Sequence, residues 1–206
     1  VHWIDALPHA FEGIILGNEV IDAMPVEIIS YQQGQYQQQT VIINDDQLQL
    51  SYRAPPFHLQ TALEQLPLPT IEGYTTELNP QLRAWIQSLS QSLKRGALLL
   101  IDYGYAQAEY YHPDRTQGTL LCHYQHRVHD NALIWPGLQD ITASVDFTTL
   151  TQAAYQAGFT QASYTTQAQF LMANNLAEHF NQLLTQHPEQ AYTLAQQVRL
   201  LTLPAE

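Results

Sequence analysis

The feature that most constrains the fold is a short apolar run, residues 14–16, which ends abruptly at Gly17 and is followed by polar residues. Such a run predicts a buried strand. Asn18 is a favourable helix N-cap, so we expect a helical turn to begin there, with Glu19 and Asp22 on one of its faces. In open α/β sheets ligands bind at the carboxyl ends of strands, so this pattern delivers an amide and two carboxylates to a candidate site. The spacing is equally compatible with a capped turn that carries two solvated acids.

A second strand with an acid at its carboxyl end is expected at residues 97–101, followed by Asp102 and Tyr103. The helix before it is predicted to start at the N-cap residue Asn79 and to stop at Gly96. A carboxylate at the end of a parallel strand again lies where α/β sheets bind ligands. Tyr103 suits the same cleft, and it suits the core as well.

Other elements are predicted from periodicity and from turn or cap residues along the rest of the chain. They comprise a β region at about 27–54, a short helix at 58–66, a long loop at about 105–145, a helix capped by Asp146 that runs through residue 157, a strand at 162–165, an amphipathic helix at 168–184 and a last strand at 198–203. A loop as long as 105–145 is usually functional or disordered, and its aromatic, histidine and glycine content argues against disorder.

The charge and the cysteine content of the chain limit the partners and the cellular compartment that it suits. The formal net charge is −12 with only 7 Lys plus Arg residues, which argues against nucleic acid as a partner. An acidic surface suits a cationic partner such as an arginine-bearing protein segment, and it is also common on proteins with no such partner. The single cysteine, Cys122, fits a reducing compartment, and no apolar run is long enough to span a membrane. We therefore expect a cytoplasmic protein.

Four stretches in series resemble the MidA family of S-adenosylmethionine (SAM)-dependent methyltransferases. They are NEVIDAMPV at residues 18–26, LLLIDYGY at 98–105, GTLLCHYQHRVHD at 118–130 and DITASVDF at 140–147. Mitochondrial members of that family assist the assembly of respiratory complex I by methylating an arginine of one of its subunits. Each stretch alone is weak evidence, whereas the four in this order make a specific match.

The resemblance implies an α/β, Rossmann-like SAM-methyltransferase fold. The Gly-rich loop that holds SAM in that fold is not in this sequence, so we expect residues 1–206 to be the C-terminal part of one methyltransferase domain, without its N-terminal half. The antiparallel β region at about 27–54 is then an insertion, and the loop at about 105–145 lies on the substrate side.

The expected sheet places the strand at 14–16 beside the strand at 97–101. An antiparallel strand at 198–203 follows, and the strand at 162–165 lies at the edge. A bare apolar edge promotes association. We therefore expect the first strand either to form a homodimer or to pair with the missing half.

If the methyl acceptor is an arginine nitrogen, paired carboxylates are its natural clamp, because they bind the planar guanidinium in bidentate fashion. Glu19 and Asp22 fit that role and are the candidate catalytic residues, while Gly17 and Asn18 are the candidate SAM-binding residues. The candidate substrate-binding residues, which the resemblance supports, are Asp102, Tyr103, Arg127, His129, Asp130 and Asp140.

The histidines of the long loop allow three interpretations. His123, His126 and His129 could join Asp130 in a metal site, although zinc sites space their ligands differently. Ordinary packing and hydrogen bonding is the more common role for such residues. The resemblance favours the third interpretation, in which Arg127, His129 and Asp130 contact substrate, so no metal ligand is expected.

The resemblance therefore implies a SAM-dependent methyltransferase that modifies arginine in a protein substrate, linked to respiratory complex I assembly and mitochondrial in eukaryotic relatives. Without the cofactor loop, this chain is expected to be inactive alone. Two alternatives stay open. One is a non-catalytic assembly or binding module on a methyltransferase scaffold, and the other is a small-molecule methyltransferase.

Overall fold

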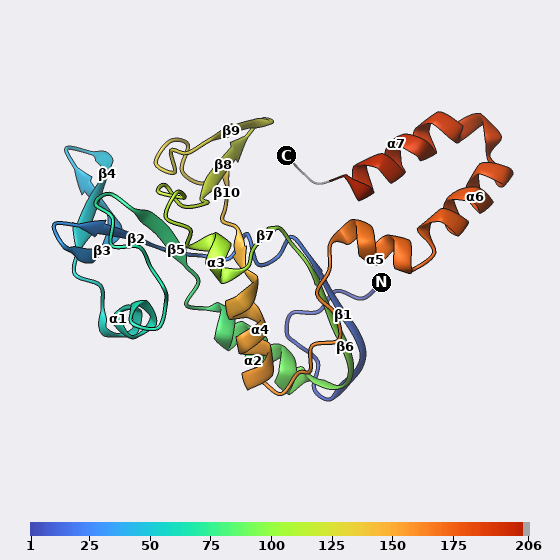
Figure 1. Ribbon diagram of the computed structural model, residues 1–206, viewed down its shortest axis with the longest axis horizontal. Helices are drawn as coiled ribbons and strands as arrows, with labels where there is room; N and C mark the ends of the chain where they lie inside the picture. The colour runs from blue at the N-terminus through green and yellow to red at the C-terminus, as the bar shows by residue number, and fades with distance from the viewer. Residues whose placement is uncertain (204–206) are drawn as a thin grey trace. The chain divides into compact units, whose positions relative to one another are not determined.

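The computed structural model describes residues 1–203, which divide into two compact units, Val1–Thr160 and a second unit that begins at Gln161 (Figure 1). The first unit is a mixed α/β structure, and the second is helical. Within residues 1–203, every helix is too short or too polar to cross a bilayer.

A parallel pair of strands, β1 (Phe11–Asn18) and β6 (Leu93–Ile101), confirms the predicted neighbours. Gly13 lies opposite Gly96 in this register. A Cβ atom on Gly96 would lie 1.7 Å from the carbonyl oxygen of Gly13, and the φ angle of Gly96 is +152°. Only glycine permits so close an approach of the two backbones.

Helices α2 (Leu82–Ser92) and α4 (Phe147–Gln156) pack against one face of this parallel pair. The opposite face is open, because Ile14 is 70% exposed and Leu16 is 64% exposed. Within residues 1–203, β1 also has one edge without a strand partner. The buried core between helices and strands consists of Ile21, Leu82, Ile86, Leu89, Val145, Leu150 and Ala153.

Helix α4 begins at its predicted cap, since Asp146 Oδ1 accepts hydrogen bonds from two first-turn amides at 3.0 and 3.1 Å. Helix α2 begins at Leu82, three residues after the predicted cap Asn79, whose Oδ1 accepts from the amides of Gln81 and Leu82 at 3.2 and 3.0 Å. The predicted end of α2 at Gly96 is wrong, because residues 93–96 turn extended and pair with β1 instead. Backbone hydrogen bonds of the ladder replace those of a further helical turn.

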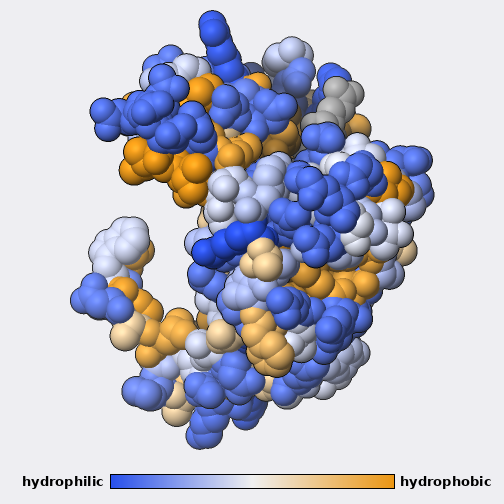
Figure 2. All heavy atoms as spheres, turned by 90° about the vertical axis from the view of Figure 1, so that its left-hand side faces the viewer, coloured by the Kyte–Doolittle hydropathy of each residue, from blue (hydrophilic) through white to orange (hydrophobic). Residues whose placement is uncertain are grey.

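The β region predicted at about 27–54 is present and forms an antiparallel sheet in the order β4-β3-β2-β5. Its strands are β2 (Glu27–Gln32), β3 (Gln35–Asn44), β4 (Gln47–Arg53) and β5 (Thr75–Leu78). Helix α1 (Phe57–Leu63) confirms the predicted short helix and contributes the buried Leu59 to a second core beside Ile29 and Leu78. Figure 2 views the molecule from the side of this sheet and shows hydrophobic atoms at the surface among hydrophilic ones.

The segment expected to be a long loop contains short elements. They are β7 (Gly104–Tyr105), α3 (Gln107–Tyr110), β8 (Leu121–Tyr124), β9 (Arg127–His129), β10 (Asp140–Thr142) and β11 (Val145–Asp146). Strands β8, β9 and β10 form a small antiparallel sheet, and β11 pairs in parallel with β7. Backbone pairing between distant parts of the segment therefore replaces the predicted irregular loop.

The second unit contains α5 (Gln167–Ala173), α6 (Leu176–Gln186), the short 3-10 turn η1 (Pro188–Gln190) and α7 (Ala191–Thr202). The single helix predicted at 168–184 is broken between α5 and α6. Asn175 adopts a left-handed conformation there, with φ of 64°, which asparagine tolerates better than most residues.

Two strand predictions in the second unit are wrong. Residues 162–165 form no strand, and Val198 lies in α7. The alternation of apolar residues after Val198 is too short to distinguish a strand from a helix. Leu194, Val198 and Thr202 recur every four residues and are less exposed than their neighbours, which is the helical period.

Candidate active site

The carboxyl ends of β1 and β6 bring Asp22, Asp102 and Tyr103 into one hydrogen-bonded cluster, which we call the acid cluster. The Tyr103 hydroxyl donates to Asp22 Oδ2 at 2.7 Å. Asp102 Oδ2 accepts from the amides of Ile21 and Asp22 at 2.9 and 3.3 Å, and its Oδ1 accepts from the Tyr103 amide at 3.0 Å. Two predicted strand-end acids thus share one site.

The turn after β1 creates this arrangement. The amide of Glu19 donates to the carbonyl of Ile101 at 2.9 Å, which extends the parallel ladder by one residue. The chain then bends so that Ile21 enters the core and Asp22 is only 5% exposed. The carbonyl of Asp22 accepts from the amide of Ala143 at 2.9 Å, which ties the turn to the segment after β10.

The helical turn predicted at Asn18 is wrong. Glu19 has a φ of 49°, which a right-handed helix excludes, and Asn18 is the last residue of β1. Asn18 and Glu19 are exposed whereas Asp22 is buried, so the two acids do not share a helix face. A Cβ on Gly17 would lie 3.0 Å from the Leu100 side chain, so close packing explains that glycine.

The electrostatics of the acid cluster follow from burial and from like charge. Burial raises the pKa of Asp102, the charge of Asp22 raises it further, and the bonds from the amides of Ile21, Tyr103 and Asp22 oppose the rise. Burial also raises the pKa of Tyr103, partly opposed by a hydrogen bond with Thr142, and both carboxylates add to the rise. Within residues 1–203, no cationic side chain lies within 4.0 Å of either carboxylate. The negative charge of the cluster is therefore uncompensated.

The other predicted substrate-side residues lie on the small sheet of β8, β9 and β10. Arg127, Asp130 and Asp140 are exposed. Strand β10 ends at Thr142, which contacts Tyr103 of the acid cluster. Asp140 is two residues earlier, and two residues of strand span about 7 Å. The structure thus connects this sheet to the acid cluster through Thr142.

His129 differs from the other histidines of this segment. Its two ring nitrogens are buried and have no hydrogen-bond partner in the described part of the chain. Its ring packs edge-on against Trp135, with centroids 5.5 Å apart. His123 and His126 are exposed. Within residues 1–203, no group of three or more histidine, cysteine or acidic residues could hold a metal ion.

A second buried acid, Glu77 in β5, was missed by sequence reasoning. Its carboxylate accepts from the amide of Thr119 at 2.9 and 3.0 Å, from the Thr119 hydroxyl at 3.1 Å and from the amide of Leu120 at 3.0 Å. Burial raises the pKa of Glu77, and these hydrogen bonds oppose the rise. The sequence around Glu77 does not distinguish it from other charged residues, because the burial of its neighbours Thr76 and Leu78 appears only in the structure.

Comparison with known proteins identifies the family. A family model described as "Putative S-adenosyl-L-methionine-dependent methyltransferase" matches residues 1–165. The chain belongs to this family. This result confirms the predicted membership of a SAM-dependent methyltransferase family.

Two crystal structures of COG1565 superfamily proteins from Burkholderia thailandensis resemble this methyltransferase-family chain. One, bound to S-adenosyl-homocysteine, is 37% identical with a TM-score of 0.89, and the match covers 97% of this chain and 52% of that chain. The other is also 37% identical, with a TM-score of 0.90, and the match covers 97% of this chain and 54% of that chain. This chain therefore spans about half the length of these solved relatives.

A curated relative is the protein arginine methyltransferase NDUFAF7 homolog, mitochondrial, of Drosophila melanogaster. It is 28% identical over 150 residues, which cover 70% of this chain and 32% of that protein. SAM is the cofactor of the family, and S-adenosyl-homocysteine in the solved relative is what remains of SAM after methyl transfer. In this chain, Asn18 is exposed at the carboxyl end of β1, where doubly wound sheets bind nucleotides, and its amide can donate and accept.

Proposed function

We propose that this chain carries the acceptor side of a SAM-dependent methyltransferase site in a Rossmann-like fold, and that the acceptor is an arginine of a protein. The observation that supports this most directly is the uncompensated charge of Asp22 and Asp102. Close carboxylates without a cationic neighbour attract a cation. A guanidinium supplies positive charge and a planar set of N–H donors that matches carboxylates.

The residues of the cluster have separable roles. The Tyr103 hydroxyl holds Asp22 Oδ2, and three backbone amides hold Asp102, so both carboxylates are fixed before an acceptor arrives. Tyr103 is 40% exposed and forms the open side of the cluster. Glu19, exposed at the start of the turn, is a further carboxylate at this end of β1. Such fixed charges orient the acceptor nitrogen without reorganisation during the reaction.

When bound, SAM supplies an electrophilic methyl group on a sulfonium. A guanidinium nitrogen that takes up this methyl group must give up a proton, so the chain's own part would be to hold the nitrogen and to receive that proton. Asp22 and Asp102 accept N–H bonds from the guanidinium, and the raised pKa of Asp102 suits it to receive that proton. Asn18, exposed at the end of β1, is the residue that we propose contacts the cofactor.

The test uses the longest natural protein that contains this chain, with SAM and arginine-containing peptides. Asp22→Asn and Glu19→Gln should each lower methyl transfer by about 100-fold or more, the scale of losing a positioned acid or base, while SAM affinity stays within a few-fold. Asp45→Asn, in the exposed turn between β3 and β4, is the matched control and should retain activity. Full activity of Asp22→Asn would remove the acid cluster from the mechanism.

The same protein distinguishes the alternatives. A non-catalytic binding module predicts no SAM binding in calorimetry, whereas the enzyme binds SAM. Labelled methyl groups recovered in metabolites rather than in protein would support a small-molecule methyltransferase. The proposed link to respiratory complex I assembly rests on the family resemblance, and a methylated arginine in a subunit of that complex would support it.

A further inference from the structure

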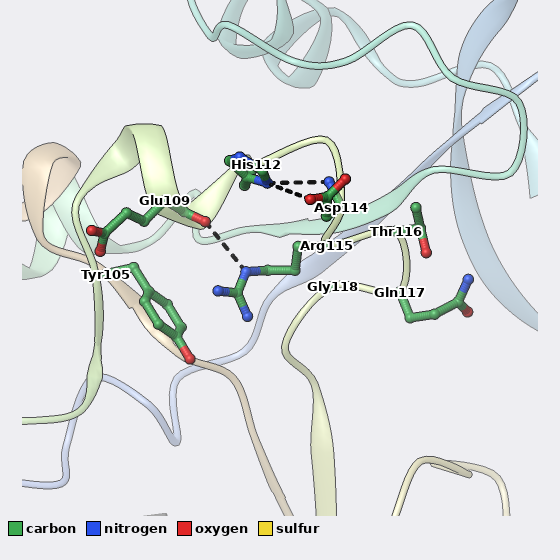
Figure 3. Close-up of a pocket in the computed structure, with 8 residues that line it drawn as sticks. All are labelled: Tyr105, Glu109, His112, Asp114, Arg115, Thr116, Gln117 and Gly118. Carbon is green, nitrogen blue, oxygen red and sulfur yellow. Dashed lines mark hydrogen bonds and ion pairs between the residues drawn. The ribbon is translucent and has the colours of Figure 1, made fainter. Parts of the chain in front are cut away.

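A pocket of about 550 Å³ is lined by residues between 105 and 118, which follow Tyr103 of the acid cluster in the sequence (Figure 3). It begins at Tyr105, two residues after Tyr103, and its other walls come from α3 and from the turn at residues 112–118. Two residues of extended chain span about 7 Å, so the pocket and the acid cluster are neighbours along one segment.

Arg115 is the central group of this pocket. Its guanidinium carbon lies 4.0 Å from the centre of the Tyr105 ring, a cation–π contact. Its Nε donates to the carbonyl oxygen of Glu109 at 3.3 Å. Figure 3 shows the Glu109 carboxylate pointing away from the guanidinium, so the main chain of this residue, and not its charge, contacts Arg115.

Arg115 forms no ion pair within residues 1–203, although the chain has 19 acidic residues against 7 Lys plus Arg. The nearby Asp114 lies 3.7 Å from His112 Nδ1 instead. With Nε committed to a carbonyl and one face stacked on Tyr105, the two terminal nitrogens retain their donors for a ligand. The guanidinium of Arg115 is therefore held in one orientation by Glu109 and Tyr105, while no acidic side chain within residues 1–203 pairs with its charge.

The turn that carries Arg115 is held at both ends. The carbonyl of Thr116 accepts from the amide of Thr75 in β5 at 2.9 Å, and the amide of Arg115 donates to the carbonyl of His112 at 2.9 Å. Just after the turn, Glu77 accepts from the amides of Thr119 and Leu120. An arginine on a fixed turn loses little entropy when it binds, which favours specific recognition.

We propose that Arg115 and Tyr105 form a subsite for an anionic group, a carboxylate or a phosphoryl group, on the acceptor protein near its target arginine. The assignment to the acceptor rests on the proposed function, whereas anion binding itself does not. A planar guanidinium fork binds two oxygens of such a group at once. The acid cluster and this subsite would together recognise an arginine that is followed or preceded by an acidic residue.

Anion binding is tested on this chain by NMR at constant ionic strength, through the backbone amide signals of residues 115–118 in the parent and in every variant. The Nε–Hε signal of Arg115 is a second reporter in the proteins that keep this arginine. The probes are inorganic phosphate and N-acetyl-aspartate methylamide. A saturable shift is expected for at least one probe, and Arg115→Gln should weaken binding at least about tenfold, equivalent to about 1.4 kcal/mol. Arg115→Lys should weaken it less, and Tyr105→Phe, which keeps the aromatic face, should bind as the parent does.

Arg95→Gln, an exposed arginine of β6, is the charge-matched control and should bind as the parent does. The absence of a saturable shift with both probes, or equal weakening by Arg95→Gln, would overturn the subsite. Saturation by phosphate alone assigns a phosphorylated residue, and saturation by the aspartate probe assigns an acidic side chain.

The acceptor assignment is tested separately, by binding of fluorescent peptides to the longest natural protein that contains this chain. An arginine peptide with a neighbouring aspartate should bind at least about fivefold more tightly than its asparagine counterpart, and Arg115→Gln should abolish the difference. Equal binding of the two peptides would overturn the acceptor assignment. Because the measurement needs no turnover, its result is distinct from a failure of the methyltransferase proposal.

Discussion

Gly118 is a residue at which a single added methyl group should collide with a buried carboxylate. Its φ is +71°, and a Cβ atom there would lie 2.1 Å from Glu77 Oε1, 2.8 Å from Glu77 Cδ and 2.9 Å from Glu77 Oε2. The carboxylate cannot retreat freely, because Thr119 and Leu120 hold it with three donors and it is buried. Gly118→Ala therefore combines two destabilising effects, backbone strain and a displaced carboxylate.

The magnitude follows from these two costs. A left-handed conformation costs a non-glycine residue about 1–2 kcal/mol. Displacing Glu77 leaves buried donors unsatisfied, which costs about 1–3 kcal/mol more. We therefore expect Gly118→Ala to lower the free energy of unfolding by about 2–5 kcal/mol. Gly73→Ala is a matched control, because Gly73 has a φ of +81° with nothing within 4 Å of the position that a methyl group would occupy, and it should cost only about 1–2 kcal/mol.

Urea denaturation followed by circular dichroism measures both variants. A double-mutant cycle with Glu77→Ala isolates the contact, because without the carboxylate Gly118→Ala should cost no more than Gly73→Ala does. The coupling energy should be about 1–3 kcal/mol. Equal destabilisation by Gly118→Ala and Gly73→Ala in the parent protein would refute the argument that Glu77 occupies this space.

Three further predictions concern the acid cluster and the open strand. Carbon-detected NMR titration should place the pKa of Asp102 above its ordinary value, and Asp22→Asn should lower that pKa; an Asp102 pKa at or below the ordinary value would contradict the cluster electrostatics. Because the folded state binds this proton more tightly than the unfolded chain does, Asp102 should make the free energy of unfolding fall as pH rises from the unfolded pKa through the folded pKa. Tyr103→Phe removes the donor to Asp22 Oδ2 and should cost about 1–3 kcal/mol in urea denaturation, whereas an unchanged midpoint would mean that solvent replaces the hydroxyl. Sedimentation should show this chain associating through the exposed Ile14 and Leu16, and Ile14→Glu should shift it to monomer with a stability change within about 0.5 kcal/mol; a parent chain that sediments as a monomer at all concentrations would contradict the expectation.

Local sequence signals predicted those parts of the fold whose physical cause is local. The N-caps Asn79 and Asp146 bind amides two or three residues away, so their role can be read from neighbouring residues. The apolar runs of β1 and β6 predicted two strands, and their parallel pairing is observed. The predicted burial of β1 is wrong on one face, where Ile14 and Leu16 are exposed. Signals of the same kind were ambiguous at Val198, where a few alternating apolar residues are compatible with either period.

The sequence predicted which acidic residues belong to the candidate site, but it did not predict their relative positions or burial. The sequence placed Asp22 and Asp102 at the ends of two strands, and the structure does bring them together. It did not indicate that Asp22 would be buried while Glu19 stays exposed, since that depends on a left-handed residue immediately after β1. Glu77 and Arg115 gave no signal that distinguished them from other charged residues.

The sequence by itself determined the family, the two apolar strands and the acids that follow them. Only the tertiary structure decided which groups these charges meet: Glu77 accepts hydrogen bonds from the amides of a turn some forty residues away, and within residues 1–203 neither Arg115 nor the acid cluster forms an ion pair. The physical reason is that capping and periodicity act over a few residues of chain, while burial and charge pairing depend on groups that only folding brings within a few ångströms.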